Sequence, residues 1–350
     1  MQMRVLGKTD IAVSALSFGS LFTSRLGPGI EESRRAVHRA IDLGINYFDT
    51  APAYANSEET LGECLSDIRT LLVISTKLGG RPQPFDAQDK RRLVSSFEES
   101  LRLLHRDVID ILFIHEPDRP QQYAWWTNPE ETYGPVIEVL DDLKRRGLIR
   151  FTGLGGTTCA EMAHCIRSNR FDVVLTAFNY SALFREAAHE VLPAAKERRM
   201  GVVLGSALQQ GALGRRFDDV VQQKPAWLSQ PRQQQLLAFY RLLDESGLNI
   251  VELCLRFALS DPEIHTVLIG PKTAAHVEAS VAAAEKGPLP ADIMGRLDEI
   301  AAMVPFRPFE EPMILPLNNP QGYWGPGIAN LGAGAPVGKS LARRASEGEP

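Results

Sequence analysis

The chain alternates short apolar runs with longer amphipathic stretches over most of its length. The apolar runs are rich in β-branched and aromatic residues, as buried strands are, and the amphipathic stretches have the period of surface helices. Near-continuous apolar strands that alternate with helices are typical of a parallel sheet covered on both faces. Eight runs have this character, at residues 16–18, 45–48, 71–74, 108–114, 149–153, 173–177, 202–204 and 267–269.

The spacing of these runs predicts how the sheet is organised. Eight evenly spaced units without a break in composition favour an α/β fold closed into one (β/α)8 TIM barrel, over a doubly wound open sheet. We expect the barrel domain to cover residues 1–304. Before the first unit, the turn at residues 7–10 predicts a β-hairpin that covers the barrel bottom. The helices are predicted at residues 33–43, 58–65, 90–104, 135–146, 160–168 and 185–199.

Two segments depart from the regular spacing. A long loop with Trp125 and Trp126 leaves the strand that ends near His115, on the face where barrels build their active sites. It fits a lid or substrate wall as well as it fits an aromatic pad packed on the barrel rim. Residues 305–350 form a Pro- and Gly-rich tail, in which Tyr323 and Trp324 are candidates for the mouth of the site and residues 332–350 are expected to be disordered.

Composition and charge narrow the class of protein. Hydrophobic residues make up 44% of the chain and charged residues 23%, as in a folded globular protein. The formal net charge of -5 argues against nucleic acid as a partner. The N-terminus has no apolar signal region and no run reaches the ~18 apolar residues of a membrane span, which predicts a cytoplasmic protein. The four cysteines form no CxxC pair, so we expect reduced thiols and no metal site.

Polar side chains follow three consecutive predicted strands. Asp49, Lys77 and His115 each come at the end of an apolar run, where barrels hold catalytic groups. Taken singly, each also fits a structural role, as part of a core ion pair or as a histidine on the rim. Tyr54, five residues after Asp49, adds a phenol on the loop above the barrel. The four residues together predict one catalytic site.

The motifs around these residues resemble those of the aldo-keto reductase superfamily over most of residues 1–300. The resemblance implies hydride transfer between NAD(P)H and a carbonyl or alcohol, with Tyr54 supplying or removing the proton on oxygen. Lys77 would stabilise the phenolate, Asp49 would hold Lys77 charged, and His115 would hydrogen-bond the substrate oxygen. The motifs are Asp49-Thr50-Ala51 with Tyr54, Ser57-Glu58 with Leu61-Gly62, Ser75-Thr76-Lys77, His115-Glu116-Pro117-Asp118, and residues 206–213.

The resemblance also implies a cofactor site at several strand ends. Lys272 is a candidate partner for a 2′-phosphate, which favours NADP while leaving NAD possible. Gly155 and Gly156 stand where the superfamily carries a Ser-Asn pair, Leu175 where it carries a glutamine, and Gly205 where an aromatic ring stacks on nicotinamide. This pattern is closer to the sugar and pyridoxal dehydrogenases, including L-galactose dehydrogenase-like enzymes. The implied cofactor residues are Gly19, Gly155, Gly156, Ser206, Leu208, Gln210, Gly211, Ile269, Gly270, Lys272, His276 and Ser280.

The sequence leaves more than one function open. The first is an oxidoreductase for a small aldehyde, ketone or sugar, whose substrate contacts include Trp125 and Trp126. The second is a nicotinamide-binding regulatory subunit that senses redox state for a partner protein with little turnover. A barrel hydrolase with paired carboxylates has little support, because Asp49 is better explained as the partner of Lys77.

Overall fold

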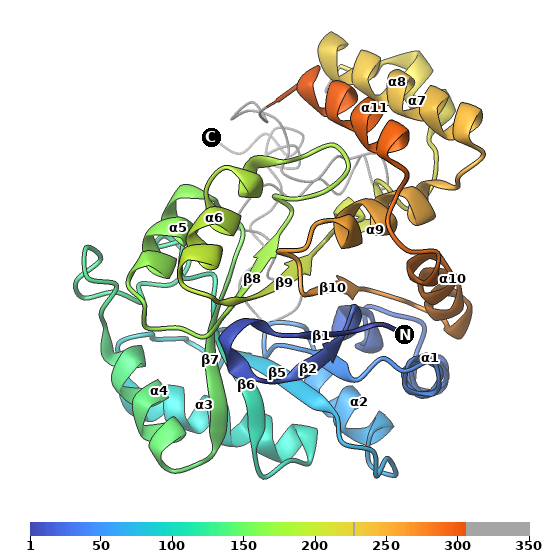
Figure 1. Ribbon diagram of the computed structural model, residues 1–350. Helices are drawn as coiled ribbons and strands as arrows, with labels where there is room; N and C mark the ends of the chain where they lie inside the picture. The colour runs from blue at the N-terminus through green and yellow to red at the C-terminus, as the bar shows by residue number, and fades with distance from the viewer. Residues whose placement is uncertain (227, 306–350) are drawn as a thin grey trace, which may run out of the picture.

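The barrel is closed by eight parallel strands in a computed structural model that describes residues 1–226 and 228–305 (Figure 1). Each strand pairs with the next in the chain, and the last pairs with the first. The structure therefore confirms the predicted fold. The strands are β3 (Leu16–Gly19), β4 (Tyr47–Asp49), β5 (Val73–Leu78), β6 (Ile109–His115), β7 (Ile149–Gly156), β8 (Val173–Ala177), β9 (Gly201–Gly205) and β10 (Thr266–Ile269).

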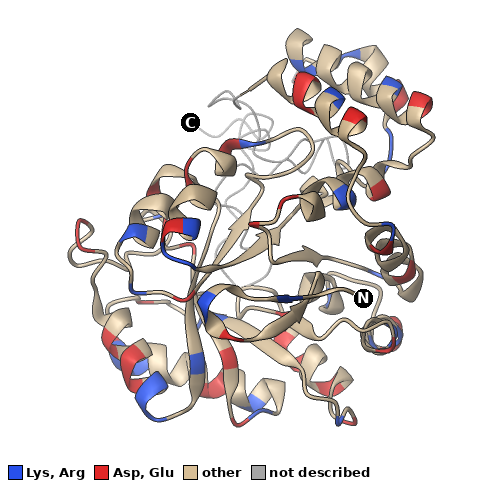
Figure 2. Cartoon of the chain, viewed as in Figure 1, with Lys and Arg blue, Asp and Glu red and all other residues tan. Residues whose placement is uncertain are grey.

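Helices surround the barrel and cover the outer face of the strands (Figure 1). Charged residues of both signs are interspersed over these helices (Figure 2), as expected for a solvated outer layer. No helix in the described part of the chain is long and apolar enough to span a membrane. The helices are α1 (Ile30–Asp42), α2 (Ser57–Cys64), α3 (Lys90–Leu104), α4 (Pro135–Arg145), α5 (Ala160–Arg167), α6 (Val191–Glu197), α7 (Asp218–Gln223), α8 (Gln230–Ser246), α9 (Ile250–Ser260), α10 (Ala274–Glu285) and α11 (Ala291–Ala302).

Two regions differ from the predicted helices. The helix expected over residues 185–199 is a 3-10 turn at Glu186–Ala188 followed by the short α6. Between the two segments, Glu190 lies outside the helical conformation (φ -132°). Helices α7 and α8 are an insertion in the chain between β9 and the barrel helix α9. Helix α8 packs against α7 and α11 outside the barrel (Figure 1). Beyond the barrel, the predicted tail lies outside the described residues except for Pro305.

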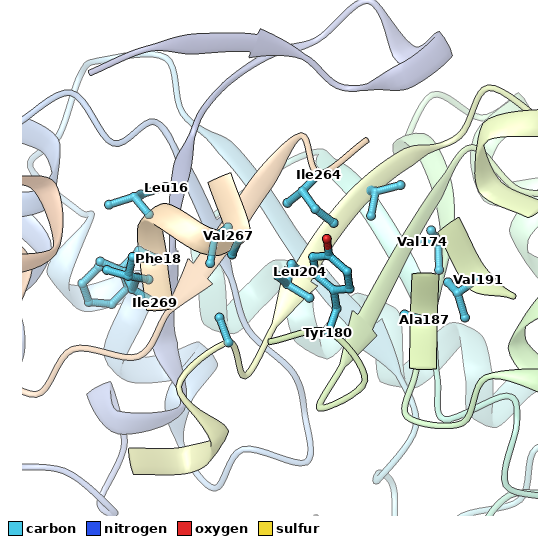
Figure 3. Close-up of a cluster of buried hydrophobic side chains, with 14 of the residues drawn as sticks. Leu16, Phe18, Val174, Tyr180, Ala187, Val191, Leu204, Ile264, Val267 and Ile269 are labelled. Carbon is cyan, nitrogen blue, oxygen red and sulfur yellow. The ribbon is translucent and has the colours of Figure 1, made fainter. Parts of the chain in front are cut away.

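The strands sort their side chains by alternation. On β3, β9 and β10, every second residue points outward into the layer under the helices. Figure 3 shows Leu16 and Phe18 of β3 beside Val267 and Ile269 of β10, all within one buried cluster. The residues between them face the barrel interior. Strand alternation thus builds two separate cores.

The N-terminal hairpin closes the bottom of the barrel. Strand β1 (Met3–Val5) pairs with β2 (Ala12–Ser14) across a 3-10 turn at Gly7–Thr9. Leu6, Ile11 and Val13 from this hairpin belong to the same buried cluster as the interior residues of five barrel strands. The predicted covering role is therefore confirmed.

A substitution at Gly7 tests this closure. Gly7 has φ +55°, and a Cβ atom built on it would lie 2.2 Å from the backbone nitrogen of Gly201. Gly147 has a similar φ of +73°, but a Cβ atom built on it would meet no atom within 4 Å. Gly147→Ala therefore measures the cost of the backbone strain without the clash. We expect Gly7→Ala to lower the free energy of unfolding by about 1–3 kcal/mol more than Gly147→Ala. Equal losses in urea titrations of the two variants would mean that the hairpin does not press on β9.

Candidate active site

The interior of the barrel changes from apolar to polar toward the C-terminal ends of its strands. Along β6 the interior positions read Ile111, Phe113 and then His115, so the last one is polar. Strand β5 reaches Lys77 by the same alternation, and β4 ends at Asp49. Because every second side chain of a strand faces the interior, three of the four predicted catalytic side chains lie at the same end of the barrel.

Asp49 and Lys77 form a buried ion pair. Nζ of Lys77 lies 2.7 Å from Oδ2 of Asp49 and also donates to the backbone oxygen of Thr50 at 2.7 Å. The two side chains are 3% exposed or less. Burial lowers the pKa of Lys77 and the Asp49 carboxylate opposes that shift. The carboxylate thus favours the charged ammonium, as the sequence predicts.

Two further side chains hold Asp49, Ser75 of the lysine motif and Tyr47, and the sequence analysis gave neither of them a role. Ser75, two residues before Lys77 on β5, donates to Oδ1 of Asp49 at 2.6 Å. The buried hydroxyl of Tyr47 donates in turn to Ser75 at 3.0 Å. Both carboxylate oxygens are therefore satisfied. Ser75 and Tyr47 are both polar residues at interior positions of a strand. The alternation of side chains along the strands could have indicated this from the sequence.

A second buried carboxylate supports the strand that carries Lys77. Glu58, at the start of α2, accepts from the Thr76 hydroxyl at 2.6 Å and pairs with Arg81 at 2.5 Å. Glu58 is only 2% exposed. These contacts tie the start of α2 to the end of β5 and to the segment that follows it.

Tyr54 and His115 meet directly above the ion pair. Their rings lie edge to face with centroids 5.7 Å apart, and Nζ of Lys77 lies 4.9 Å from the centre of the Tyr54 ring. All four predicted catalytic residues are thus brought together. They come from three strand ends and the loop that follows β4.

The ionisation of Tyr54 differs from the expectation that Lys77 favours its phenolate. Burial raises the pKa of Tyr54 well above its usual range, and the Asp49 and Glu116 carboxylates raise it further. The reason is that the Lys77 ammonium is directed at Asp49 and Thr50, and its charge is balanced by the paired carboxylate. Tyr54 is therefore a protonated phenol at neutral pH.

His115 is a neutral imidazole. Burial lowers its pKa to about 3, and the positive charge of Lys77 acts in the same direction. Nδ1 is buried without a hydrogen-bond partner in the structure. A neutral ring carries one N–H, so His115 retains a donor without a charge.

The tryptophan loop packs against His115 from one side. Trp125 is fully buried and its Nε1 donates to the His115 backbone oxygen at 2.9 Å. Trp126 is partly buried and donates to the Pro117 oxygen at 3.0 Å. The structure favours the packed-pad interpretation for Trp125. Tyr123, on the same loop, is a further aromatic neighbour, with its ring centroid 6.5 Å from that of His115. Tyr323 and Trp324 lie outside the described residues.

The candidate cofactor residues lie at the same end of the barrel as the catalytic ones. Gly19, Gly156 and Ile269 each end a strand, and Gly155 directly precedes the end of β7. The segment after β9 is strained, because Ser206 and Gln210 have φ near +57° and +50°. Such strain in non-glycine residues is concentrated at ligand sites. The loop also contains Leu208 and Gly211.

At the end of β10 the candidates differ in accessibility. Lys272 is exposed, with its Nζ 4.6 Å from the centre of the Phe22 ring. Gly270 lies between the strand and Lys272, and His276 is exposed on α10. Ser280 is 6% exposed and donates to the His276 backbone oxygen at 2.8 Å, so its hydroxyl is already engaged within the helix.

Three of the four positions that depart from the superfamily pattern are glycines, and the space around each is defined. A Cβ atom on Gly156 would lie 2.3 Å from Sδ of Met162 and 2.5 Å from Oδ1 of Asp118, so a side chain there would have to displace these two. A Cβ on Gly155 would meet nothing closer than 3.7 Å and would lie beside Lys77. Gly205 is tighter, with Ala177 and Leu175 at 3.2 and 3.3 Å from its Cβ position.

These surroundings fit a nicotinamide cofactor. The open position at Gly155 leaves space next to Lys77, and the buried Oε1 of Gln209 has no hydrogen-bond donor in the structure. A carboxamide N–H is the kind of group that such an acceptor takes.

Comparison with known proteins agrees with this geometry. A family model described as the aldo/keto reductase family matches residues 16–302. The chain belongs to the aldo/keto reductase family. This membership supports nicotinamide-dependent oxidoreduction as the activity class.

Among its relatives, this aldo/keto reductase is 30% identical to L-galactose dehydrogenase of Arabidopsis thaliana, over 81% of this chain and 88% of the relative. It is 25% identical to a probable voltage-gated potassium channel subunit beta of the same plant, over 88% and 98% of the two chains. An aldo-keto reductase from Bacillus halodurans, solved in its holo form, superimposes with a TM-score of 0.68 at 27% identity. That match covers 86% of this chain and 96% of the other.

The neutral state of His115 predicts a pH dependence of stability. Because its folded pKa (about 3) lies below the unfolded value of ~6.5, its contribution is fully present above pH ~6.5 and is lost as the pH falls toward 3. This group alone should cost the wild type about 2 kcal/mol between pH 6.5 and pH 5.

The variant His115→Asn should not show this loss. The stability difference between the two proteins, measured by urea unfolding, should therefore shift by that amount over the interval. His105→Asn, at an exposed position after α3, is the control. A difference that stays constant with pH would contradict a neutral buried His115.

Proposed function

We propose that the protein is an NAD(P)-dependent carbonyl reductase and alcohol dehydrogenase in which Tyr54 exchanges the proton on the substrate oxygen. The observation that carries the proposal is the buried Asp49–Lys77 pair beneath the Tyr54 ring, with His115 at its edge. A structural ion pair alone would not explain why an uncharged imidazole and a phenol share the same end of the cavity.

In the reducing direction, the phenol is the proton donor. The high pKa of Tyr54 keeps it protonated until a substrate oxygen gains negative charge next to it. Lys77, held by Asp49 and the Thr50 oxygen, positions its ammonium 4.9 Å from the centre of the ring that loses the proton. The N–H of neutral His115 donates a hydrogen bond to the same substrate oxygen and orients it. When bound, the nicotinamide cofactor supplies the hydride in this direction and accepts it in the other.

The names of the relatives suggest a substrate class. One is called L-galactose dehydrogenase and another, from Pseudomonas sp and 29% identical, D-threo-aldose 1-dehydrogenase, although that match covers only 58% of this chain. We propose a small aldehyde or a sugar as substrate, with Trp126 on the wall of the site.

Removing the Tyr54 hydroxyl tests the proton path. Tyr54→Phe should lower kcat at least about 10³-fold while leaving the Kd for NADPH within about twofold, because only a transition-state interaction is lost. Tyr133→Phe is the matched control, since the Tyr133 hydroxyl bonds Glu138 at the start of α4. Steady-state reduction of an aldehyde panel, with fluorescence titration of NADPH, gives both quantities. An unchanged kcat in Tyr54→Phe would remove this tyrosine from the mechanism.

The proposed cofactor is NADP, with NAD as the alternative, and Lys272 decides between them. If its ammonium pairs with a 2′-phosphate, Lys272→Ala should raise the Kd for NADPH about fivefold and leave that for NADH unchanged. Fluorescence quenching measures both values on the same preparations. Equal effects on the two cofactors would argue against a phosphate contact.

A second candidate function is a nicotinamide-binding regulatory subunit. The likeness to proteins named as potassium channel beta subunits, which extends over 88% of this chain, favours it. It requires cofactor binding but little turnover. Tight NADPH binding by the wild type, without oxidation of NADPH against a broad carbonyl panel, would select this candidate instead.

A further inference from the structure

Glu116 follows His115 at the end of β6 and has no part in the mechanism above. Its backbone is left-handed, with φ +49°, which is uncommon for a residue with a side chain. The backbone nitrogen donates to the Gly155 oxygen at 2.7 Å, so the residue is tied to the neighbouring strand β7. The strained conformation is therefore held in place beside the reacting end of the barrel.

The Glu116 carboxyl is buried but poorly satisfied. The residue is 3% exposed, and its Oε2 atom accepts no hydrogen bond in the structure. Nε of Arg119 lies 3.6 Å away, which is an ion-pair contact, while this Nε donates to Thr157 Oγ1 at 2.7 Å. A buried acceptor without a donor is costly, so such an atom is often completed by a ligand.

Two carboxylate oxygens of the loop after β6 are buried without a hydrogen-bond partner among the described residues, Oε2 of Glu116 and Oδ1 of Asp118. The indole N–H groups of Trp125 and Trp126 already donate to backbone oxygens. Asp118 accepts from the Thr157 and Thr158 nitrogens through Oδ2, whereas its buried Oδ1 has no partner. An ionised carboxylate can only accept hydrogen bonds. Oδ1 of Asp118 lies near Met162 of α5, beside the Gly156 position, so the Glu116 oxygen is the one that suits a ligand with an O–H donor.

Glu116 lies at the catalytic end of the barrel. It directly follows His115 in the chain, and its backbone nitrogen bonds Gly155, whose Cβ position lies beside Lys77. Its charge also raises the pKa of the Tyr54 phenol. A Cβ atom on the adjoining Gly155 would make only ordinary van der Waals contacts, the nearest at 3.7 Å, so the end of β7 is not crowded beside Lys77. Glu116 is thus the buried carboxyl next in the chain to the histidine proposed to orient the substrate oxygen.

We propose that Glu116 is a specificity-determining residue that accepts a hydrogen bond from a hydroxyl group next to the reacting carbon. The substrate class is then a hydroxylated aldehyde or aldose rather than a plain aldehyde or a carboxylate-bearing one. The inference rests on the proposed function, because it needs the reacting oxygen between Tyr54 and His115.

The protonation of Glu116 supplies a second signature. Burial raises its pKa to about 7, Asp118 raises it further, and Arg119 opposes both. An ionised carboxylate is a stronger acceptor than a carboxylic acid. The preference for a hydroxylated substrate should therefore increase as the pH rises from 6 to 8.

The test compares two three-carbon aldehydes, glyceraldehyde and propionaldehyde, which differ in their hydroxyl groups. We expect Glu116→Leu to lower kcat/KM for glyceraldehyde on the order of 10- to 100-fold, the effect of losing a hydrogen bond to a charged group. The value for propionaldehyde should stay within about twofold. Glu116→Gln should abolish the rise in preference between pH 6 and 8. Glu131→Leu and Glu131→Gln, at an exposed position on the same loop, are the controls.

The outcomes separate a specificity role from a structural one. Equal losses for both aldehydes, or an unchanged preference with an unchanged pH profile, would overturn the proposal. If Glu116→Leu does not fold, as judged by circular dichroism, the pH profile of Glu116→Gln decides alone. A wild type that reduces neither aldehyde, although it binds NADPH, would contradict the proposed function and this inference with it.

Discussion

The ion pair between Asp49 and Lys77 is the constraint on which the rest of the site depends. An ammonium with almost no exposure is tolerable only when a carboxylate and further acceptors surround it, here Asp49 and the Thr50 oxygen. Ser75 and Tyr47 then fix the carboxylate. The Tyr54 ring packs against the Lys77 ammonium, so its position depends on this fixed pair in the barrel interior.

The barrel makes this arrangement possible through simple alternation. Apolar interior positions and the hairpin fill the lower half of the cavity, and the same alternation brings polar residues to the upper end. The upper end then holds little uncompensated charge near the reacting atoms, because the lysine is paired and His115 is neutral. The loop after β6 adds Glu116, whose buried Oε2 has no hydrogen-bond donor in the part of the chain that the structure describes.

The sequence predicted most of this, for physical reasons. Buried parallel strands are nearly all apolar, so β3 to β10 stood out, and strand-end residues converge by geometry, so the four catalytic candidates could be grouped. The prediction failed where the cause was tertiary: the break before α6, the insertion of α7 and α8, and the burial of Trp125. The raised pKa of Tyr54 could not be predicted either. It depends on burial and on the Lys77 ammonium being directed at Asp49 and Thr50, which only the structure shows.

A double-mutant cycle on unfolding tests the central role of the ion pair most directly. It compares the wild type with Asp49→Asn, Lys77→Met and the double variant in urea titrations. Each single change should cost about 3–5 kcal/mol, because it leaves one buried charge without its partner. The double variant should be more stable than the sum predicts by at least ~2 kcal/mol. Losses that add to within ~0.5 kcal/mol would contradict the account.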